Sequence, residues 1–165
     1  MAKTWVEKMA DKKTMPKILK LEKGFPCYNA VHSMGAEAGD KVVLVNASEI
    51  APIMQKVPKG KLISIIEICN IVAKKHKTKG CCSLVAGIQV MTIANAVEEV
   101  LVNKIKSDVA KIPYWRTVKS HGELNHKFPG GLEGHAKLLE KEGSKIEKKG
   151  KRWFVKDYEK FLVKP

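Results

Sequence analysis

The chain has 165 residues, 44% of them hydrophobic, so it is long enough to bury the core of one domain. Basic residues outnumber acidic residues by 31 to 17, and the formal net charge is +14 at pH 7. We see no run near the ~18 apolar residues of a membrane span and no apolar signal-peptide core at the N-terminus, which predicts a cytoplasmic monomer without a membrane partner.

The positive charge comes almost entirely from lysine, since Arg116 and Arg152 are the two arginines of the sequence. Lysine carries a hydrated point charge that suits phosphate contacts better than the bidentate reading of bases. The charge therefore favours a polyanionic partner such as a nucleic acid, with specificity from shape or from a pocket. The alternative is that the lysines serve only solubility.

The four cysteines are Cys27, Cys69, Cys81 and Cys82. Their spacing matches no disulfide framework, and the paired Cys-x-x-Cys pattern of structural zinc sites is missing. We predict free and mostly buried thiols, with no metal and no cofactor. The weaker alternative is a zinc site that also uses His76.

The N-terminal part has one clear helix signal. Thr4 and Glu7 fit a capping box, and Trp5 lies one helical turn from Met9, which predicts a short helix that docks by Trp5. Residues 11–41 show no clear period and are expected to be rich in loops, followed by a strand at 41–45. We therefore divide the chain into an N-terminal extension, residues 1–45, and a domain over residues 46–165.

The middle of the chain predicts a helix-turn-helix. An amphipathic helix over 46–56, with Ser48 as its N-cap, precedes a second helix that starts at the capping box Ser64–Glu67 and ends near Lys75. A basic turn with Gly80 leads to a third helix from about residue 83 to 99. This last helix is apolar nearly all round, so it is either a buried core helix or one whose small residues let its backbone approach a groove of nucleic acid.

The stretch from Lys111 to Gly143 has the layout of a site. It begins with a strand-like run over 112–118, turns at residues 120–123, and continues through a Pro-Gly-Gly loop into a helix that ends at Gly143. Residues 145–155 then predict a tight hairpin, with five cations and one acid in 145–152. This hairpin is either a wing that rests on phosphates or an edge hairpin protected by its lysines.

Three segments resemble the DNA-binding domain of the O6-alkylguanine-DNA alkyltransferase family. VPKGK at 57–61 is similar to the family's entry into its helix-turn-helix, and IPYWRTV at 112–118 is similar to its active-site motif IPCHRVV. The segment from Gly130 to Gly143 is similar to its GGL…LL…EG. The resemblance covers roughly residues 48–145 and implies an α+β fold, a winged helix-turn-helix domain with a short N-terminal extension.

The chain departs from the family at the residues that carry the chemistry. Tyr114 stands where the family has its alkyl-accepting Cys and Trp115 where it has His, while Glu142 matches the Glu that orients that His. A phenol with a pKa near ~10 cannot replace a thiolate, so we predict no catalytic residue and no enzyme. The family's Tyr in the first helix is replaced by Ile65, and its inserted Arg by Ala86.

The resemblance points to the alkyltransferase-like branch of the family, whose members lack the Cys, bind alkylated duplexes through the minor groove, flip the lesion into the pocket and flag it for excision repair. It implies double-stranded DNA containing alkylated guanine as the partner, together with a repair protein. The alternative is a repurposed winged helix that binds RNA or a protein, its pocket closed by Tyr114 and Trp115.

The resemblance also implies site residues. Tyr114 and Trp115 either stack on a flipped base or fill the pocket as core. In the family the residue matched by Arg116 mainly supports the turn. The expected pocket is formed by Tyr114, Trp115, Asn95, Phe128, Pro129, Gly130, Gly131 and Glu142. The expected DNA contacts are the loop lysines and residues near or on the second helix of the motif: Lys59, Lys61, Lys79, Ser83, Ala86, Gln89, Arg116 and Lys119.

Overall fold

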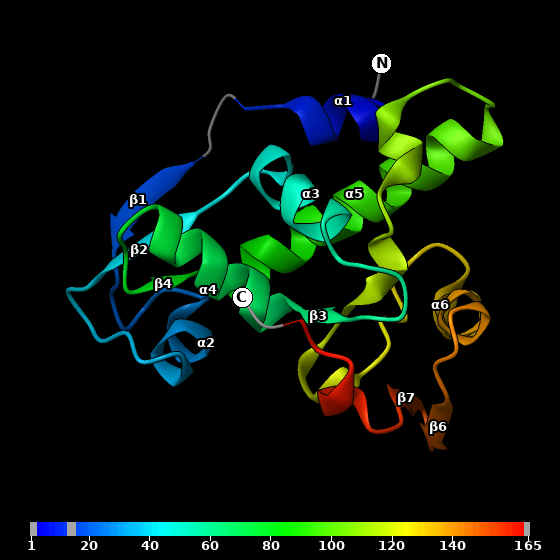
Figure 1. Ribbon diagram of the computed structural model, residues 1–165. Helices are drawn as coiled ribbons and strands as arrows, with labels where there is room; N and C mark the ends of the chain where they lie inside the picture. The colour runs from blue at the N-terminus through cyan, green and yellow to red at the C-terminus, as the bar shows by residue number, and fades with distance from the viewer. Residues whose placement is uncertain (1–2, 13–15, 164–165) are drawn as a thin grey trace.

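The computed structural model describes residues 3–12 and 16–163, which form a mixed α+β fold (Figure 1). Residues 13–15 of the stretch expected to be loop-rich lie outside the described residues. The helices are α1 (Trp5–Ala10), α2 (Tyr28–Ser33), α3 (Ala47–Gln55), α4 (Ile65–Lys75), α5 (Ser83–Val102) and α6 (Gly131–Lys141), and four 3₁₀ turns are η1 (Asp108–Lys111), η2 (Tyr114–Arg116), η3 (Ser120–Gly122) and η4 (Tyr158–Lys160). The strands are β1 (Lys17–Lys20), β2 (Lys41–Leu44), β3 (Ile63–Ser64), β4 (Gly80–Cys81), β5 (Thr117–Val118), β6 (Ile146–Lys149) and β7 (Arg152–Val155).

A three-stranded sheet joins the N-terminal part to the rest of the chain. β1 pairs antiparallel with β2, and β2 pairs in parallel with β4, where Val43 lies opposite Cys81. The stretch expected to be rich in loops contains β1 and α2, elements of four and six residues that are too short to show a period in the sequence. The domain boundary at residue 45 stays a prediction, although this sheet takes strands from both sides of it.

The capping signals were read correctly at two helices and incorrectly at a third. Both capping boxes, Thr4 with Glu7 and Ser64 with Glu67, are formed. The prediction that Ser48 caps α3 is wrong, because the Asn46 side chain accepts the backbone N–H of Glu49 and holds the N-cap position. Asn is at least as good an N-cap as Ser, so two candidates, two residues apart, competed for one N-cap position.

Helix α5 is the centre of the molecule. It is long and apolar enough to cross a membrane by length and composition, contrary to our expectation from the sequence. In this fold it packs against α1, α3 and α4, and its buried side chains lie inside the protein core, which is the behaviour of a core helix. These side chains include Ala86, Val90, Ile93, Ala94 and Val97.

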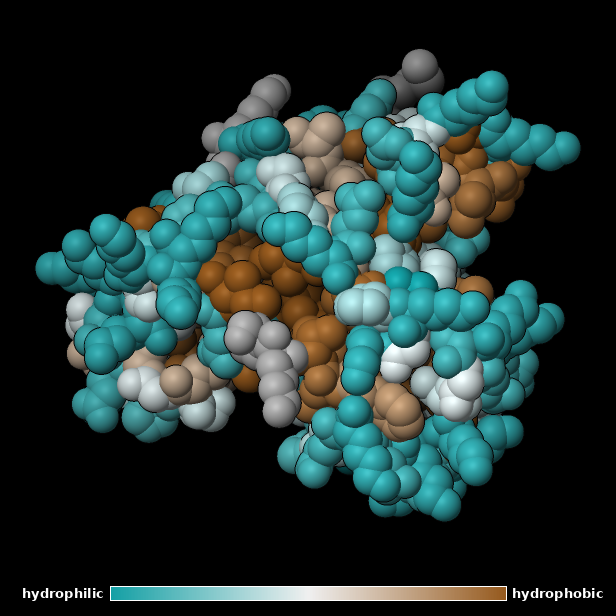
Figure 2. All heavy atoms as spheres, viewed as in Figure 1, coloured by the Kyte–Doolittle hydropathy of each residue, from teal (hydrophilic) through white to brown (hydrophobic). Residues whose placement is uncertain are grey.

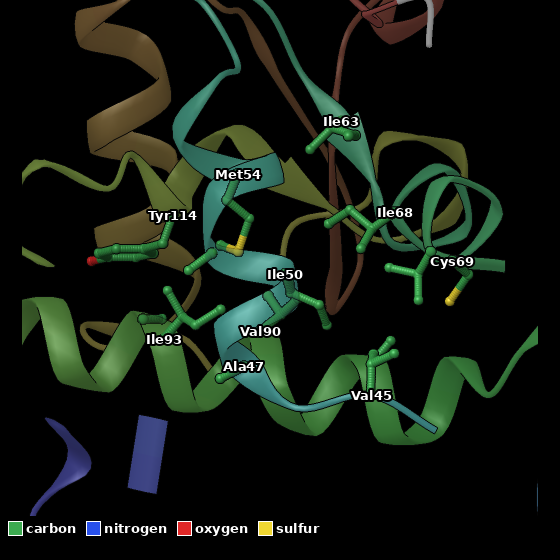
Figure 3. Packing of buried hydrophobic residues seen from close by; sticks show 14 of the residues in the cluster. Val45, Ala47, Ile50, Met54, Ile63, Ile68, Cys69, Val90, Ile93 and Tyr114 are labelled. Atoms are coloured by element: carbon green, nitrogen blue, oxygen red, sulfur yellow. The ribbon is translucent and has the colours of Figure 1, made fainter. Parts of the chain in front are cut away.

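The largest hydrophobic cluster lies between α3, α4 and α5, as Figure 3 shows. Ile50 and Met54 from α3 point toward Val90 and Ile93 of α5, and the ring of Tyr114 enters the same cluster from η2. Each fully buried aliphatic side chain of this kind contributes about 1.5–3 kcal/mol to folding. The predicted site residue Tyr114 is therefore also a core residue.

The segment around Tyr114 is a turn rather than the predicted strand. Residues 114–116 form the 3₁₀ turn η2, and only Thr117 and Val118 pair, in parallel, with Ile63 and Ser64. Pro113 precedes the turn and has no N–H to donate to a ladder, which limits the strand to two residues.

The elements after this turn follow the prediction. Helix α6 ends at Lys141, and Gly143 takes the predicted C′ position with a φ of 95°. The predicted hairpin forms as β6 and β7, with Lys149 opposite Arg152 across the turn. A third hydrophobic cluster, which includes Leu124, Leu139 and Val155, joins this hairpin to α6.

Candidate nucleic-acid interface

Tyr114 fills the position at which the family resemblance placed a pocket. Its side chain is 1% exposed, and its hydroxyl donates a hydrogen bond of 2.7 Å to Oε1 of Glu98 on α5. The ring packs edge-to-face on Phe128 and Trp115, with centroid distances of 5.3 and 5.5 Å. Burial, and then the Glu98 carboxylate, raise the pKa of Tyr114 above its ordinary value. The phenol is therefore neutral and enclosed.

Arg116 and Glu142 form a largely buried ion pair behind this ring. The guanidinium donates to the carboxylate through Nε at 2.9 Å and Nη2 at 2.6 Å, and through Nη1 to the carbonyl oxygen of Val57 at 2.6 Å. Burial alone would raise the pKa of Glu142, but Arg116 together with Trp115 and the backbone of Gly60 outweighs burial, and the pKa is lowered. Arg116 thus ties η2 to α6 and to the end of α3, which is the supporting role that the resemblance implies.

Trp115 lies beside this pair and is partly buried. Its indole N–H is close enough to Glu142 to help lower the pKa of the carboxyl, although the geometry falls short of a hydrogen bond. The Arg116 guanidinium lies 5.7 Å from the indole ring centroid. Trp115 and Arg116 are therefore held together as part of the turn.

Sequence reasoning missed His135, which holds the loop before α6 in place. The ring is 1% exposed, Nδ1 accepts the backbone N–H of Asn125 at 3.1 Å, and Nε2 donates to the carbonyl oxygen of Trp115 at 2.7 Å. Burial lowers its pKa to about 4, so the imidazole is neutral at pH 7. The signal that would have found it is its place on the apolar face of α6, three residues after Leu132 and four before Leu139.

The remaining expected pocket residues surround a packed interior. Phe128 is buried between Tyr114 and His135. Gly130 has a φ of 84° and lies so close to Gly134 that a Cβ would stand 3.2 Å from the Gly134 Cα. Asn95 donates to Met91 within α5. These residues therefore shape the protein around Tyr114 instead of lining an open cavity.

An open groove lies beside this interior, and we call it the α5 groove. Its volume is about 590 Å³, and Leu84 and Ile88, one turn apart on α5, are 50% and 63% exposed. Helix α1 and the N-terminus of α4 line its other walls, and the loop after β5 supplies cations at its rim. The lining residues are Trp5, Ile65, Ser83, Leu84, Gly87, Ile88, Met91, Thr92, Lys119, Asn125, His126 and Lys127.

The structure brings together some of the expected DNA contacts and separates others. Ser83 and Lys119 both line the α5 groove. Lys59, Lys61 and Lys79 are exposed in loops, and Gln89 is half-buried on α5.

The prediction that Ala86 contacts DNA is wrong, because its side chain faces the core and is fully buried. Arg116 is held by Glu142 as described above. Leu84 and Ile88 were missed, because exposed apolar side chains on an apolar helix give no separate sequence signal. Lys127, in the loop before α6, was also missed.

A second depression, of about 630 Å³, lies over α3 and α4. In Figure 2 hydrophilic side chains surround an apolar floor there, and the lining includes Ile53 and Ile71 with Lys12, Lys56 and Lys75 at the edge. His76 Nε2 lies 2.7 Å from Glu49 Oε2 at the same place. None of the expected site residues lines this depression, so the α5 groove is the candidate interface.

The hairpin β6–β7 presents cations on aromatic rings. Lys148 Nζ lies 4.3 Å from the centroid of Trp153, and Lys149 Nζ lies 5.4 Å from that of Phe154. Arg152 also lies over the Phe154 ring, 5.3 Å from its centroid, but its guanidinium donates to both oxygens of Glu123, at 3.0 and 2.8 Å, which lowers the pKa of Glu123. The lysines are therefore better placed than Arg152 to meet an external anion.

All four cysteines are free and buried, as predicted. The neighbouring Cys69 thiol and burial raise the pKa of Cys81 above its ordinary value. Burial is the main cause that raises the pKa of Cys82, to about 11. Since the thiolate is the reactive form, these two thiols are poor nucleophiles at pH 7.

No family model matches the sequence. No curated protein matches it either. Among solved structures, the chain is similar to the crystal structure of S. pombe Atl1 in complex with damaged DNA containing O6-carboxymethylguanine. The two sequences are 17% identical, the match covers 72% of this chain and 94% of that chain, and the TM-score is 0.49. At this identity the likeness concerns the fold alone.

Proposed function

We propose that the protein binds double-stranded DNA without enzymatic activity and recognises alkylated guanine, as its motifs imply by their resemblance to alkyltransferase-like proteins. In this proposal α4 and α5 act as the helix-turn-helix and β6–β7 as the wing. The observation that carries the proposal is the α5 groove, which combines an apolar floor with Lys119 and Lys127 at its rim. Its volume lies within the roughly 300–1,000 Å³ of small-molecule sites.

The chemistry of the groove suits a base that has left its stack. Apolar side chains such as Leu84 and Ile88 contact base faces or insert at base steps, whereas lysines at the rim contact phosphates. The alkyl group of a modified guanine would meet an apolar surface. The protein would act in the cytoplasm as a monomer, and a repair protein would recognise the DNA complex.

The absence of enzymatic activity is supported by the state of the nucleophiles. Burial keeps the Tyr114 phenol neutral, and the thiols of Cys81 and Cys82 are buried with raised pKa values. Mass spectrometry after incubation with an O6-methylguanine duplex tests this directly. We expect an unchanged protein mass, and the gain of one methyl group would overturn the non-enzymatic part of the proposal.

The main test is a salt series of binding to two short duplexes that differ by one O6-methylguanine. We expect tighter binding to the modified duplex and affinity that falls steeply with salt. The variant Lys119→Ala with Lys127→Ala should flatten the slope of log K against log salt by about 2, because each phosphate contact contributes about 0.9. The matched control is Lys17→Ala with Lys20→Ala on β1, which should leave the slope within about 0.5 of the wild-type value. Equal slopes for both pairs would contradict the groove as the interface.

A second function, binding of RNA or a protein by a repurposed winged helix, is favoured by one observation. Tyr114 closes the interior in which the family holds its flipped base. A single-stranded RNA in the same salt series separates the two functions. Equal affinity for RNA and both duplexes would leave only a basic nucleic-acid-binding domain, and no binding near physiological salt would favour a protein partner.

A further inference from the structure

Helix α1 forms one end of the α5 groove, although the family resemblance begins only near residue 48. Figure 1 shows α1 at the top of the molecule, and it packs against α5. Trp5 and Met9 lie one helical turn apart on the same side of α1 but have different surroundings. Met9 packs against the main hydrophobic cluster, whereas Trp5 is only partly buried and lines the groove together with Leu84, Ile88 and Met91.

The position of Trp5 is fixed by a residue far along the chain. The Glu99 carboxylate accepts the backbone N–H of Trp5 at 3.0 Å and that of Val6 at 3.2 Å. These are N–H groups of the first turn of α1, which have no partner within the helix, and a carboxylate is favoured there by the helix dipole. A six-residue helix is not stable alone, so this contact and the packing of Met9 place α1 on α5.

The indole of Trp5 is suited to stack on a base. Lys8 Nζ lies over the indole ring, 4.1 Å from its centroid, so a cation already occupies one face of the ring and a base would stack on the opposite face. Trp5 also extends the apolar floor made by Leu84 and Ile88 with a flat aromatic ring. Bases stack on such rings whatever their sequence, because every base has a π-face.

We propose that Trp5 is a base-stacking residue of the α5 groove and that Glu99 is the positioning residue that holds it there. This inference rests on the proposed function, because it requires a base in the groove. The N-terminal helix is then part of the binding site. Stacking of one base predicts a loss of about 5- to 150-fold in affinity when the ring is removed.

The test compares the affinities for the duplexes with and without O6-methylguanine. Trp5→Leu keeps apolar bulk but removes the ring, and it should lower the ratio of the two affinities by about 5- to 150-fold, with Trp5→Phe in between. The matched control is Trp153→Leu, since Trp153 is also partly buried and has Lys148 at 4.3 Å from its ring. Trp153 lies on the hairpin, which would contact both duplexes alike, so its loss should leave the ratio unchanged.

The role of Glu99 is tested by a double-mutant cycle. Glu99→Gln should lower the ratio in the wild-type background and have no further effect in Trp5→Leu, because its action passes through Trp5. The modified duplex should also quench the indole fluorescence of the wild type more than that of Trp5→Phe. Circular dichroism of each variant confirms that the fold is kept.

Two results would overturn the inference, and they differ in their meaning. If the wild type prefers the modified duplex and Trp5→Leu keeps the same preference, Trp5 does not stack on the base, while the proposed function stands. If the wild type binds both duplexes equally, lesion recognition and the stacking role of Trp5 are both contradicted, and only general DNA binding remains.

Discussion

At the scale of single residues, the candidate site is built on two largely buried groups that hold other residues in place. Arg116 joins η2, the end of α3 and Glu142, and His135 joins Asn125 to Trp115. Neither side chain faces the α5 groove. Both act by fixing the backbone from which the groove loop, residues 119–127, extends.

We predict that Glu142→Gln destabilises the protein by on the order of 3 kcal/mol, because the change leaves the Arg116 guanidinium mostly buried without its counter-charge. Chemical denaturation measures this change. The control is Glu133→Gln on the exposed side of α6, which should change stability by less than about 0.5 kcal/mol. A loss in Glu142→Gln no larger than in the control would show that the pair contributes little.

From the burial of His135 we predict a specific dependence of protein stability on pH. Its folded pKa, about 4, lies below its ordinary value of 6.5, so the neutral ring is favoured in the folded state. The contribution of the neutral His135 ring to the free energy of unfolding is complete above pH 6.5. It is lost as the pH falls from 6.5 toward 4, by about 1.4 kcal/mol per pH unit. His135→Gln should flatten this part of the profile, whereas His32→Gln should not. An unchanged slope in His135→Gln would refute the assignment.

At the scale of elements, α4 and α5 end in the same way. Lys77 and Lys104 have φ values of 56° and 53°, in the left-handed region. The following residues, Thr78 and Ile105, donate back to Ala73 and Val100 at 2.9 Å each. This is the geometry of a helix end that favours glycine, yet lysine holds both positions. The chain keeps two cations at the cost of backbone strain.

We predict that Lys104→Gly and Lys77→Gly each stabilise the protein by about 0.5–1 kcal/mol, because glycine adopts a positive φ without a Cβ penalty. Thermal unfolding measures the gain. Lys106→Gly, two residues beyond Lys104, is the control and should give no stabilisation. A destabilised Lys104→Gly would mean that the lysine side chain makes a stabilising contact.

The hairpin β6–β7 is either a wing that contacts DNA phosphates or an edge hairpin protected by its lysines, and charge reversal distinguishes the two. Replacing Lys148, Lys149 and Lys151 with Glu reverses its charge, and we expect the affinity for both duplexes to fall by at least tenfold if it lies on phosphates. Lys12, Lys17 and Lys20, replaced in the same way, form a control with equal net charge. Unchanged duplex affinity after reversal in the hairpin would show that it is an edge hairpin.

At the scale of the whole molecule, sequence reasoning worked where a signal was local. The capping boxes at Thr4 and Ser64, the C′ glycine Gly143 after α6 and the hairpin could all be predicted, because each depends on residues within a few positions. The strand expected at 112–118 could not, because Pro113 and the packing of Tyr114 favour a turn.

The candidate site was only partly predictable for a related reason. The motifs located Tyr114 and the loop before α6, but the exposure of Leu84 and Ile88 depends on which side of α5 the other helices cover. The sequence of α5 is apolar nearly all round, so its periodicity does not distinguish the core side from the groove side. The contact between Glu99 and α1 spans 94 residues and has no local signal.

The contact between Glu99 and α1 also sets when α1 can dock on α5 during protein synthesis. Trp5 leaves the ribosome before its partner Glu99, which follows 94 residues later. At roughly 5–20 residues per second, α1 waits about 5–20 s during synthesis before its docking helix emerges. In this interval α1 has no docking partner, and the groove is complete only after the loop of residues 119–127 has also been translated.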